Sequence, residues 1–316
     1  MKRSLALCNA LIILALSLGG CARAPQSLAR VFGPPRHPQA AAATDRLLSS
    51  DPLLQKEAHV ELISLGSGAM PDLRDAIEGA TSEQRIRIIE AASRIGTPPE
   101  LLVELFGIAA KDPDTTVRKT VAFRCADHKE LEAALTPIVK GLVFDTAPGV
   151  QAAAITTLQE YSTRDTLPIP TIKTLLTHSD PLVVASATSL ALLRSEPELR
   201  AAARAALPSL IGQLNNPSPL IRAQVIIAIG KYGPMAAPAA PPLIIVMIKD
   251  KNPAIQLQCA IALARIRSKQ ALEVALPALQ QFASSPDPGL AIPAQQMLTQ
   301  IPRPATTPPQ PPQQSL

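Results

Sequence analysis

Apolar residues recur through most of the chain with the spacing of one face of a helix, and the pattern repeats about every 30 to 38 residues. The repeats start at Pro52, Ser82, Thr115, Pro148, Pro181, Pro219, Pro253 and Pro288. Two, six and ten positions after these starts, the residue is nearly always aliphatic or small. Because positions four apart share one helical face, each repeat is predicted to open with a helix that buries this face.

The residues around these starts suit the beginning of a helix. Proline is preformed for the first turn, and an aspartate just before it can accept hydrogen bonds from the free N–H groups. Candidate caps of this kind are Asp51, Asp114, Asp180 and Asp287. The first helix of each repeat is therefore expected to begin at the repeat start.

A second apolar run follows each first helix, so each repeat is predicted to be a helical hairpin. Many of the second helices are expected to start at a proline, and the candidates are Pro71, Pro137, Pro208, Pro242 and Pro277. Turns between the helices are expected at Gly66, Gly96 and Gly233. No strand-like alternation competes with this pattern. Residues 49–301 are therefore predicted to form an all-α array of seven full repeats and a last half-repeat.

Two segments make the repeat type specific. They read Asp114-Thr115-Thr116-Val117-Arg118 and Ser218-Pro219-Leu220-Ile221-Arg222, the second leading on to Ile229-Gly230-Lys231-Tyr232-Gly233. Both resemble HEAT-like repeats of the short bacterial type, such as those of the phycobilin lyases. The resemblance implies a right-handed α-α superhelix, a HEAT/armadillo-like solenoid of about seven to eight helical hairpins.

The same resemblance implies a structural role for one register position. Arg85, Arg118 and Arg222 occupy it, and in similar proteins such an arginine ties one repeat to the next. The other repeats depart from the pattern, with Gln151, Val184, Gln256 and Ala291 at that position. An arginine ladder that binds an acidic partner is the alternative interpretation, and the missing arginines disfavour it.

The first twenty residues are typical of an export signal. Lys2 and Arg3 form a cationic start, and the apolar run 5–17 is about a dozen residues, short of the roughly 20 that a membrane-spanning helix needs. The residues that follow are Leu18, Gly19, Gly20 and Cys21. They resemble the lipobox of bacterial lipoproteins, which implies cleavage before Cys21 and lipid on its thiol. An ordinary secretory signal with a cysteine nearby is the alternative.

The ends of the chain differ in composition from the repeats. Residues 21–48, rich in Ala, Pro, Gln and Ser, are predicted to be the lipidated cysteine and a flexible spacer. The arginines of this spacer either contact anionic lipid headgroups or only keep the linker soluble. They are Arg23, Arg30, Arg36 and Arg46. Residues 302–316, rich in Pro and Gln, are predicted to be a disordered tail.

Composition and charge exclude some classes of function. Loss of the signal peptide, residues 1–20, lowers the formal net charge from +5 to +3 because Lys2 and Arg3 are removed. This modest charge, the absence of tryptophan and an aromatic content of 2% argue against nucleic-acid binding.

The remaining residues with catalytic or metal-binding potential form no recognisable motif. Cys125 and Cys259 lie on apolar helix faces four repeats apart. With stacked helices about 10 Å apart they cannot form a disulfide, so buried thiols are expected. The histidines show no metal-ligand spacing; they are His37, His59, His128 and His178. No phosphate loop or nucleophile elbow occurs, so the chain is predicted to have no enzymatic activity, cofactor or metal.

These observations favour a membrane-anchored, non-catalytic scaffold of the bacterial cell envelope that binds a protein or peptide in the solenoid groove. The groove is expected to be formed by the second helices, with Arg74, Lys140, Lys173 and Lys249 as contact residues. Alternatives are a carrier of lipids or other hydrophobic components, suggested by the apolar run 243–248, and a lyase or chromophore chaperone. With Ala22 directly after the cysteine, the chain resembles lipoproteins that are sent to the outer membrane. This implies the periplasmic side of the outer membrane in an organism with two membranes, and the outer face of the cytoplasmic membrane otherwise.

Overall fold

The structure is a computed structural model that describes residues 36–161 and 167–301, and in these ranges it is helical with no strand. The predicted signal peptide, Cys21 and its lipobox, and the predicted tail lie outside the described residues. The first helices of the repeats are α4 (Pro52–Leu65), α6 (Ser82–Ile95), α8 (Thr115–Cys125), α10 (Pro148–Glu160), α12 (Pro181–Leu193), α14 (Pro219–Lys231), α16 (Pro253–Ile266) and α18 (Pro288–Gln300). Each begins at its predicted residue, so the repeat register is confirmed.

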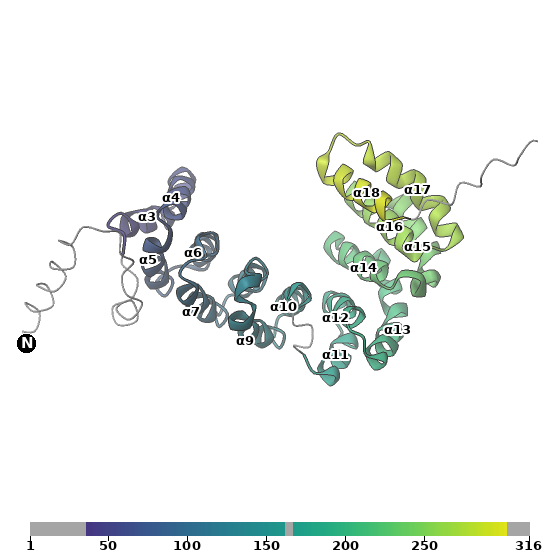
Figure 1. Cartoon of the computed structure of the whole chain (residues 1–316), viewed down its shortest axis with the longest axis horizontal. Helices are drawn as coiled ribbons and strands as arrows, with labels where there is room; N and C mark the ends of the chain where they lie inside the picture. Colours follow the sequence, from purple (N-terminus) through teal and green to yellow (C-terminus); the bar gives the residue numbers. More distant parts are fainter. Residues whose placement is uncertain (1–35, 162–166, 302–316) are drawn as a thin grey trace, which may run out of the picture.

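Second helices pair with all but the last of these, which confirms seven hairpins and a final half-repeat within the described residues (Figure 1). They are α5 (Met70–Ala76), α7 (Pro99–Ala109), α9 (Glu132–Leu142), α11 (Ile169–Leu176), α13 (Pro197–Gly212), α15 (Ala240–Lys249) and α17 (Lys269–Ala283). Short 3-10 turns lie within three of the hairpins, as η1 (Gly66–Ala69), η2 (Lys129–Leu131) and η4 (Gly233–Ala239), and η3 (Gln213–Asn215) lies between α13 and α14. The all-α solenoid predicted from periodicity is therefore the observed fold.

The helix starts are capped as the sequence indicates. Side chains that accept a hydrogen bond from the first turn are Asp51, Asp114, Asp180 and Asp287, joined by Thr81 and Asn252. Thr81 forms a capping box with Gln84, in which each side chain binds the other residue's backbone N–H. These contacts satisfy N–H groups that the helix itself leaves free.

The prediction that prolines mark the second helices is only partly correct. Pro71 and Pro242 lie in the first turns of α5 and α15, as expected. Pro137, Pro208 and Pro277 instead lie inside α9, α13 and α17. All three are exposed, so the carbonyl that each leaves without its N–H donor lies on the solvent side of the helix, where water can satisfy it.

The core is built from the predicted register. The residue six positions after each repeat start has no exposed surface; these are Ala58, Ile88, Val121, Ala154, Ala187, Val225, Cys259 and Ala294. Half of them are alanine, which lets the backbones of stacked helices approach one another. Burial of this one face in every repeat drives the stacking.

The predicted flexible spacer, residues 21–48, extends too far toward the solenoid. Residues 40–47 form the helix α3 (Ala40–Leu47), with Ala40, Ala43 and Leu47 buried against the first repeat. Arg46 pairs with Glu61 at 2.6 Å, and Arg36 pairs with Asp72 and Asp75 of α5. These two arginines are therefore engaged by the solenoid, and α3 covers the end of the stack, which would otherwise expose apolar surface.

The two layers of helices differ in spacing, and this corrects the predicted position of the groove. Successive first helices contact one another extensively, whereas successive second helices contact one another much less. The inner layer of a curved stack is the compressed one, so the first helices form the concave wall. Figure 1 shows the same arrangement, with α6, α10, α12 and α14 on the inside of the curve and α7, α9, α11 and α13 outside.

Arginines of the shared register position join one repeat to the next, as the resemblance implied. Arg118 pairs with Asp145 through Nε–Oδ2 at 2.6 Å and Nη2–Oδ1 at 2.8 Å. The corresponding pairs are Arg85 with Asp112 and Arg222 with Asp250. Each aspartate lies in the loop before the next first helix, so the pair closes the junction between two repeats.

The glutamines at this position retain part of the contact. The Nη1 atoms of Arg118 and Arg222 donate to the carbonyl six residues earlier, and the Nε2 atoms of Gln151 and Gln256 do the same at 2.6 and 2.8 Å. The residue in the facing loop changes as well. His178 takes the place of the aspartate opposite Gln151, and Asn216 takes it opposite Val184. A repeat without the arginine therefore also lacks the facing carboxylate, which leaves no charge unpaired at that junction.

Cys125 and Cys259 are buried free thiols, as predicted. Burial raises the pKa of each thiol to about 12, and the carboxylates of Asp127 and Asp250 add to the two shifts respectively. Since only the thiolate attacks, neither thiol of the folded chain starting at Ala22 is expected to react with an aromatic disulfide reagent at pH 8 within minutes. Both should react once the chain is unfolded in guanidinium. Rapid labelling of the folded chain would contradict the observed packing.

Candidate functional site

One register position marks the exposed surface of the concave wall. It lies twelve residues after each repeat start and is exposed in all eight repeats, as Ser64, Arg94, Asp127, Glu160, Leu193, Lys231, Arg265 and Gln300. We call this set the inner row. Arg94, Lys231 and Arg265 are its basic members, and its acidic members Asp127 and Glu160 pair with Arg124 and Lys129.

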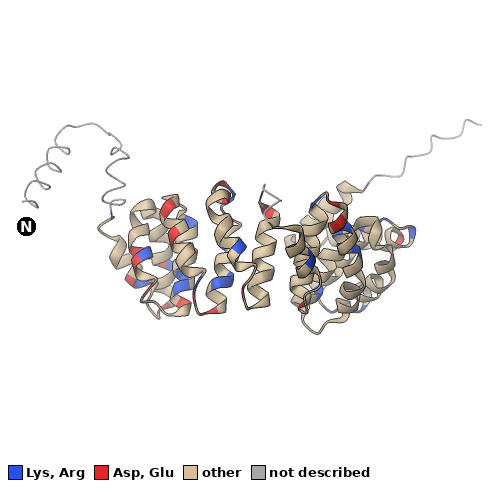
Figure 2. Ribbon diagram, turned by 90° about the horizontal axis from the view of Figure 1, so that it is seen from below, with Lys and Arg blue, Asp and Glu red and all other residues tan. Residues whose placement is uncertain are grey.

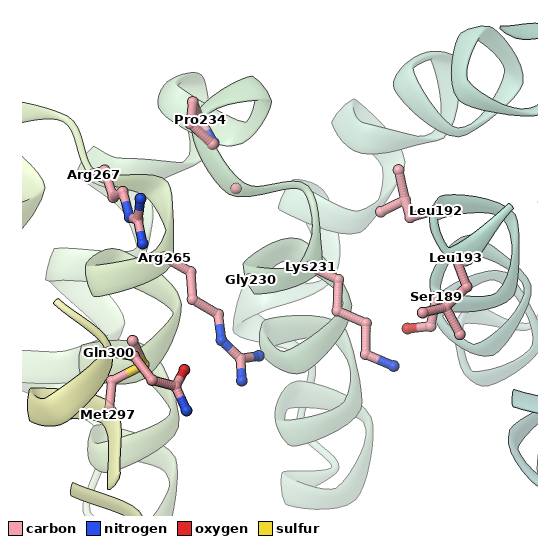
Figure 3. A pocket seen from close by; sticks show the side chains of 11 residues that line it. Ser189, Leu192, Leu193, Gly230, Lys231, Pro234, Arg265, Arg267, Met297 and Gln300 are labelled. Carbon is pink, nitrogen blue, oxygen red and sulfur yellow. The ribbon is translucent and has the colours of Figure 1, made fainter. Parts of the chain in front are cut away.

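The inner row is hollowed at its basic end. A cleft of about 470 Å³ lies where the C-terminal ends of α12, α14, α16 and α18 meet (Figure 3). Its lining residues are Ser189, Leu192, Leu193, Gly230, Lys231, Gly233, Pro234, Arg265, Arg267, Met297 and Gln300. Three of them are cationic and none is acidic, so this end cleft is both positively charged and partly apolar.

Gly230 determines how closely two walls of the end cleft approach. A Cβ at this position would lie 3.2 Å from the Ala262 Cα and 3.3 Å from the Ala262 Cβ, so α14 and α16 are nearly in backbone contact. The crossing places Lys231 of α14 near Arg265 of α16, and Figure 3 shows the Lys231 side chain extending away from Arg265, toward Ser189 and Leu193. Two like charges therefore line the same cleft.

The environment of Lys231 reflects this crowding. Partial burial lowers its pKa from the usual range, and the neighbouring Arg265 guanidinium lowers it further, while Glu160 acts in the opposite direction. The Lys231 Nζ donates to the Gln159 Oε1 of α10 at 2.8 Å, passing over α12.

Arg267 has an unusual backbone. It ends α16 in the left-handed region, with φ 59° and ψ 15°, and is the one described non-glycine residue with positive φ. At the ends of other first helices a positive φ belongs to glycine, and Gly96, at the end of α6, has the same left-handed conformation. A side chain with a Cβ costs about 1 kcal/mol or more in this region, so the fold carries strain to place an arginine here.

The cations of the end cleft lack the pairing common elsewhere in the described chain. Arginines of both layers form ion pairs, for example Arg74 with Glu104 and Arg124 with Glu90. None of the ion pairs among the described residues includes Lys231, Arg265 or Arg267. The end cleft can therefore offer unpaired positive charge to an anionic ligand.

The residues predicted to contact a partner lie elsewhere and are not brought together. They stand on four second helices of the outer layer: Arg74 on α5, Lys140 on α9, Lys173 on α11 and Lys249 on α15. Arg74 and Lys173 already pair with Glu104 and Glu198, both at 2.7 Å. Seen from the convex side, basic and acidic segments are interspersed (Figure 2). The sequence signal missed was the inner row, whose basic members recur at the repeat period.

Ser93, His128 and Glu130 have the connectivity of a hydrolase triad, although the Glu130 side chain is exposed. The Ser93 Oγ lies 2.9 Å from the His128 Nε2, and the His128 Nδ1 lies 3.3 Å from Glu130 Oε1. Ser93 and His128 are 8% and 6% exposed, and the Phe106 ring packs against the imidazole with its centroid 6.1 Å away. A substrate carbonyl therefore has no access to the hydroxyl. The contact joins the second repeat to the third.

The apolar run 243–248 that suggested a hydrophobic carrier is only partly buried in the structure. It lies in α15, where Leu243 and Val246 are buried while Ile245 and Ile248 face outward. No helix that the structure describes combines the length and apolarity needed to cross a membrane. Nor do the described residues contain three or more His, Cys, Asp or Glu placed to hold a metal ion together.

Comparison with known proteins finds likeness in fold. No protein-family model matches the chain, and no curated protein matches its sequence. Among solved structures, YibA of Escherichia coli is 14% identical over 89% of this chain and 99% of its own, with a TM-score of 0.48. The CpcE–CpcF complex of phycocyanin lyase from Nostoc is 19% identical over 83% and 99%, with a TM-score of 0.45. Human deoxyhypusine hydroxylase is 19% identical over 83% and 95%, with a TM-score of 0.35. At these identities the likeness concerns the helical-repeat fold alone.

Proposed function

We propose that this chain is a lipid-anchored binding protein of the bacterial cell envelope, which holds an extended segment of a partner protein against its concave wall. The observation that supports this most directly is the inner row, an exposed line of side chains that crosses all eight repeats. A solenoid offers such a wall to extended ligands, because each repeat adds one step of contact.

The anchor part of the proposal rests on the Leu18-Gly19-Gly20-Cys21 motif. Two or three acyl chains on one cysteine would hold a protein stably at a membrane, where a single chain would not. Ala22 favours the periplasmic face of the outer membrane in a two-membrane organism, and the outer face of the cytoplasmic membrane otherwise. The segment between Cys21 and α3 would then link the lipid to the solenoid.

Replacing Cys21 with serine tests the anchor. Without a thiol the lipid cannot be attached, so we expect the protein to leave the detergent-dependent membrane fraction, or to keep an uncut signal if processing requires lipid. Fractionation with mass spectrometry of the amino terminus measures both. Cys125→Ser is the matched control, since that thiol is buried in a repeat. A Cys21→Ser chain that is cleaved and pelleted like the wild type would contradict lipidation.

Photocrosslinking in cells tests the binding wall. A photoreactive phenylalanine analogue replaces Phe123, which shares a helical face with Asp127 of the inner row, four residues later, and is 49% exposed. The control position is Ile248 on the outer layer, which is 70% exposed. We expect a defined protein adduct from position 123 and none from position 248. Adducts from position 248 alone would contradict a concave binding wall.

A further inference from the structure

We infer that the end cleft recognises carboxylate groups of an acidic segment in the bound polypeptide, with Lys231, Arg265 and Arg267 as the recognising residues. The inference rests on the proposed function and specifies the chemistry of its ligand. Two observations support it independently: a cleft lined by three cations and by no acidic residue, and the strained backbone of one of these cations.

The proximity of Lys231 and Arg265 is built into the fold. Gly230 permits the close crossing of α14 and α16, and no described acidic side chain lines the end cleft to neutralise the pair. Like charges that Glu160 only partly compensates raise the energy of the unliganded protein, and an anion bound near them lowers it. Guanidinium groups also bind carboxylates through two parallel hydrogen bonds.

The backbone of Arg267 provides the second observation. Glycine would adopt φ 59° without strain at this helix end, as Gly96 and Gly233 do at theirs. An arginine that lines the cleft stands there instead. Strained positions of this kind persist where the side chain has a use that outweighs the cost in stability. The guanidinium of Arg267 lies on the same side of α16 as that of Arg265 (Figure 3).

The shape of the site favours a polypeptide over a membrane surface. The end cleft lies on the concave wall, which a planar bilayer cannot follow. Its apolar lining, from Leu192, Leu193 and Met297, suits aliphatic side chains between the acidic ones.

The test measures binding of a fluorescein-labelled oligoglutamate of about ten residues to the mature, detergent-solubilised protein by anisotropy. The test variant combines Lys231→Gln, Arg265→Gln and Arg267→Gly. We expect it to bind about tenfold or more weakly than the wild type, since each charged contact contributes substantially. Arg94→Gln, which removes a cation from the same row at the other end of the solenoid, should leave the affinity within about twofold.

Arg267→Gly alone separates folding from binding. Relief of the left-handed strain should raise the midpoint of thermal unfolding by a few degrees, because about 1 kcal/mol gives a shift of that size in a domain of this length. The affinity for oligoglutamate should fall. A lower midpoint would contradict the strain argument, because the variant would then have lost a packing contact instead.

Three outcomes would overturn the inference. The first is equal oligoglutamate affinity in the wild type and the triple variant. The second is absence of peptide binding, together with binding of phosphatidylglycerol vesicles that the triple substitution abolishes, which would assign the cleft to a lipid headgroup. The third is absence of peptide binding while crosslinking from position 123 persists. In that case the concave wall binds a partner of different chemistry and the proposed function stands.

Discussion

Replacement of Phe106 by alanine is expected to lower the free energy of unfolding by about 3 to 5 kcal/mol. The Phe106 side chain has no exposed surface and packs edge-on against the imidazole of His128, so it fills the junction between the second and third repeats. Truncation removes buried apolar surface and leaves a cavity that the packed helices cannot close. Urea unfolding followed by circular dichroism measures the loss.

The matched control is Phe123→Ala, the same substitution one repeat later. The Phe123 side chain is 49% exposed. The Lys119 ammonium lies over its ring, 5.7 Å from the ring centroid. We expect a change within about 1 kcal/mol, since little buried area is lost. Equal losses for the two phenylalanines would mean that Phe106 does not occupy a packed junction.

Replacement of Arg118 by glutamine is expected to lower the free energy of unfolding by about 2 to 4 kcal/mol. The side chains of Arg118 and Asp145 are 13% and 8% exposed, so loss of the arginine leaves a poorly solvated carboxylate without its partner. Glutamine is the residue that Gln151 supplies at the same register position, where it still donates to the carbonyl six residues earlier. The substitution therefore removes the contact between repeats and can keep the one within a repeat.

A second substitution should recover much of this loss. In the double variant Arg118→Gln with Asp145→Asn, no charge remains unpaired, and the new side chain can accept from the following loop N–H as Asn216 does from Ser218 at 3.0 Å. We expect at least half of the lost stability to return. A double variant no more stable than Arg118→Gln would show that desolvation of Asp145 is not the cause.

The same pair makes a contribution to stability that depends on pH. The Arg118 guanidinium holds the pKa of Asp145 below its usual range. A carboxyl with a lowered folded pKa contributes stability that is complete above its unfolded pKa of about 3.9 and is lost as pH falls through the folded pKa. The stability difference between the wild type and Arg118→Gln should therefore be full at pH 7 and shrink below about pH 4. A difference that is unchanged at pH 3 would contradict the ion pair.

The positions of the first helices could be predicted because they depend on local signals that recur. A proline or polar start, a capping side chain and apolar residues two, six and ten positions later are present in repeat after repeat, so each weak signal is supported by the others. The burial of Cys125 and Cys259 followed from the same register. The ties at Arg85, Arg118 and Arg222 were implied by the family resemblance, and the structure supplies their partners.

Two features depend on the tertiary structure and could not be predicted. α3 is a short, alanine-rich helix whose stability comes from packing on the first repeat and from the pairing of Arg46 with Glu61. Pro137, Pro208 and Pro277 are tolerated within helices because those positions face solvent, and periodicity alone does not say which side that is.

By itself the sequence determined the repeat, its length, its buried face and the motif at Cys21. The tertiary structure decided which layer is concave and hence which charges share a surface, since curvature arises from the closer packing of the first helices. Lys231, Arg265 and Arg267 therefore form one cleft although no local motif joins them. Small differences in helix spacing add up over seven junctions, and only the sum fixes the direction in which the solenoid bends.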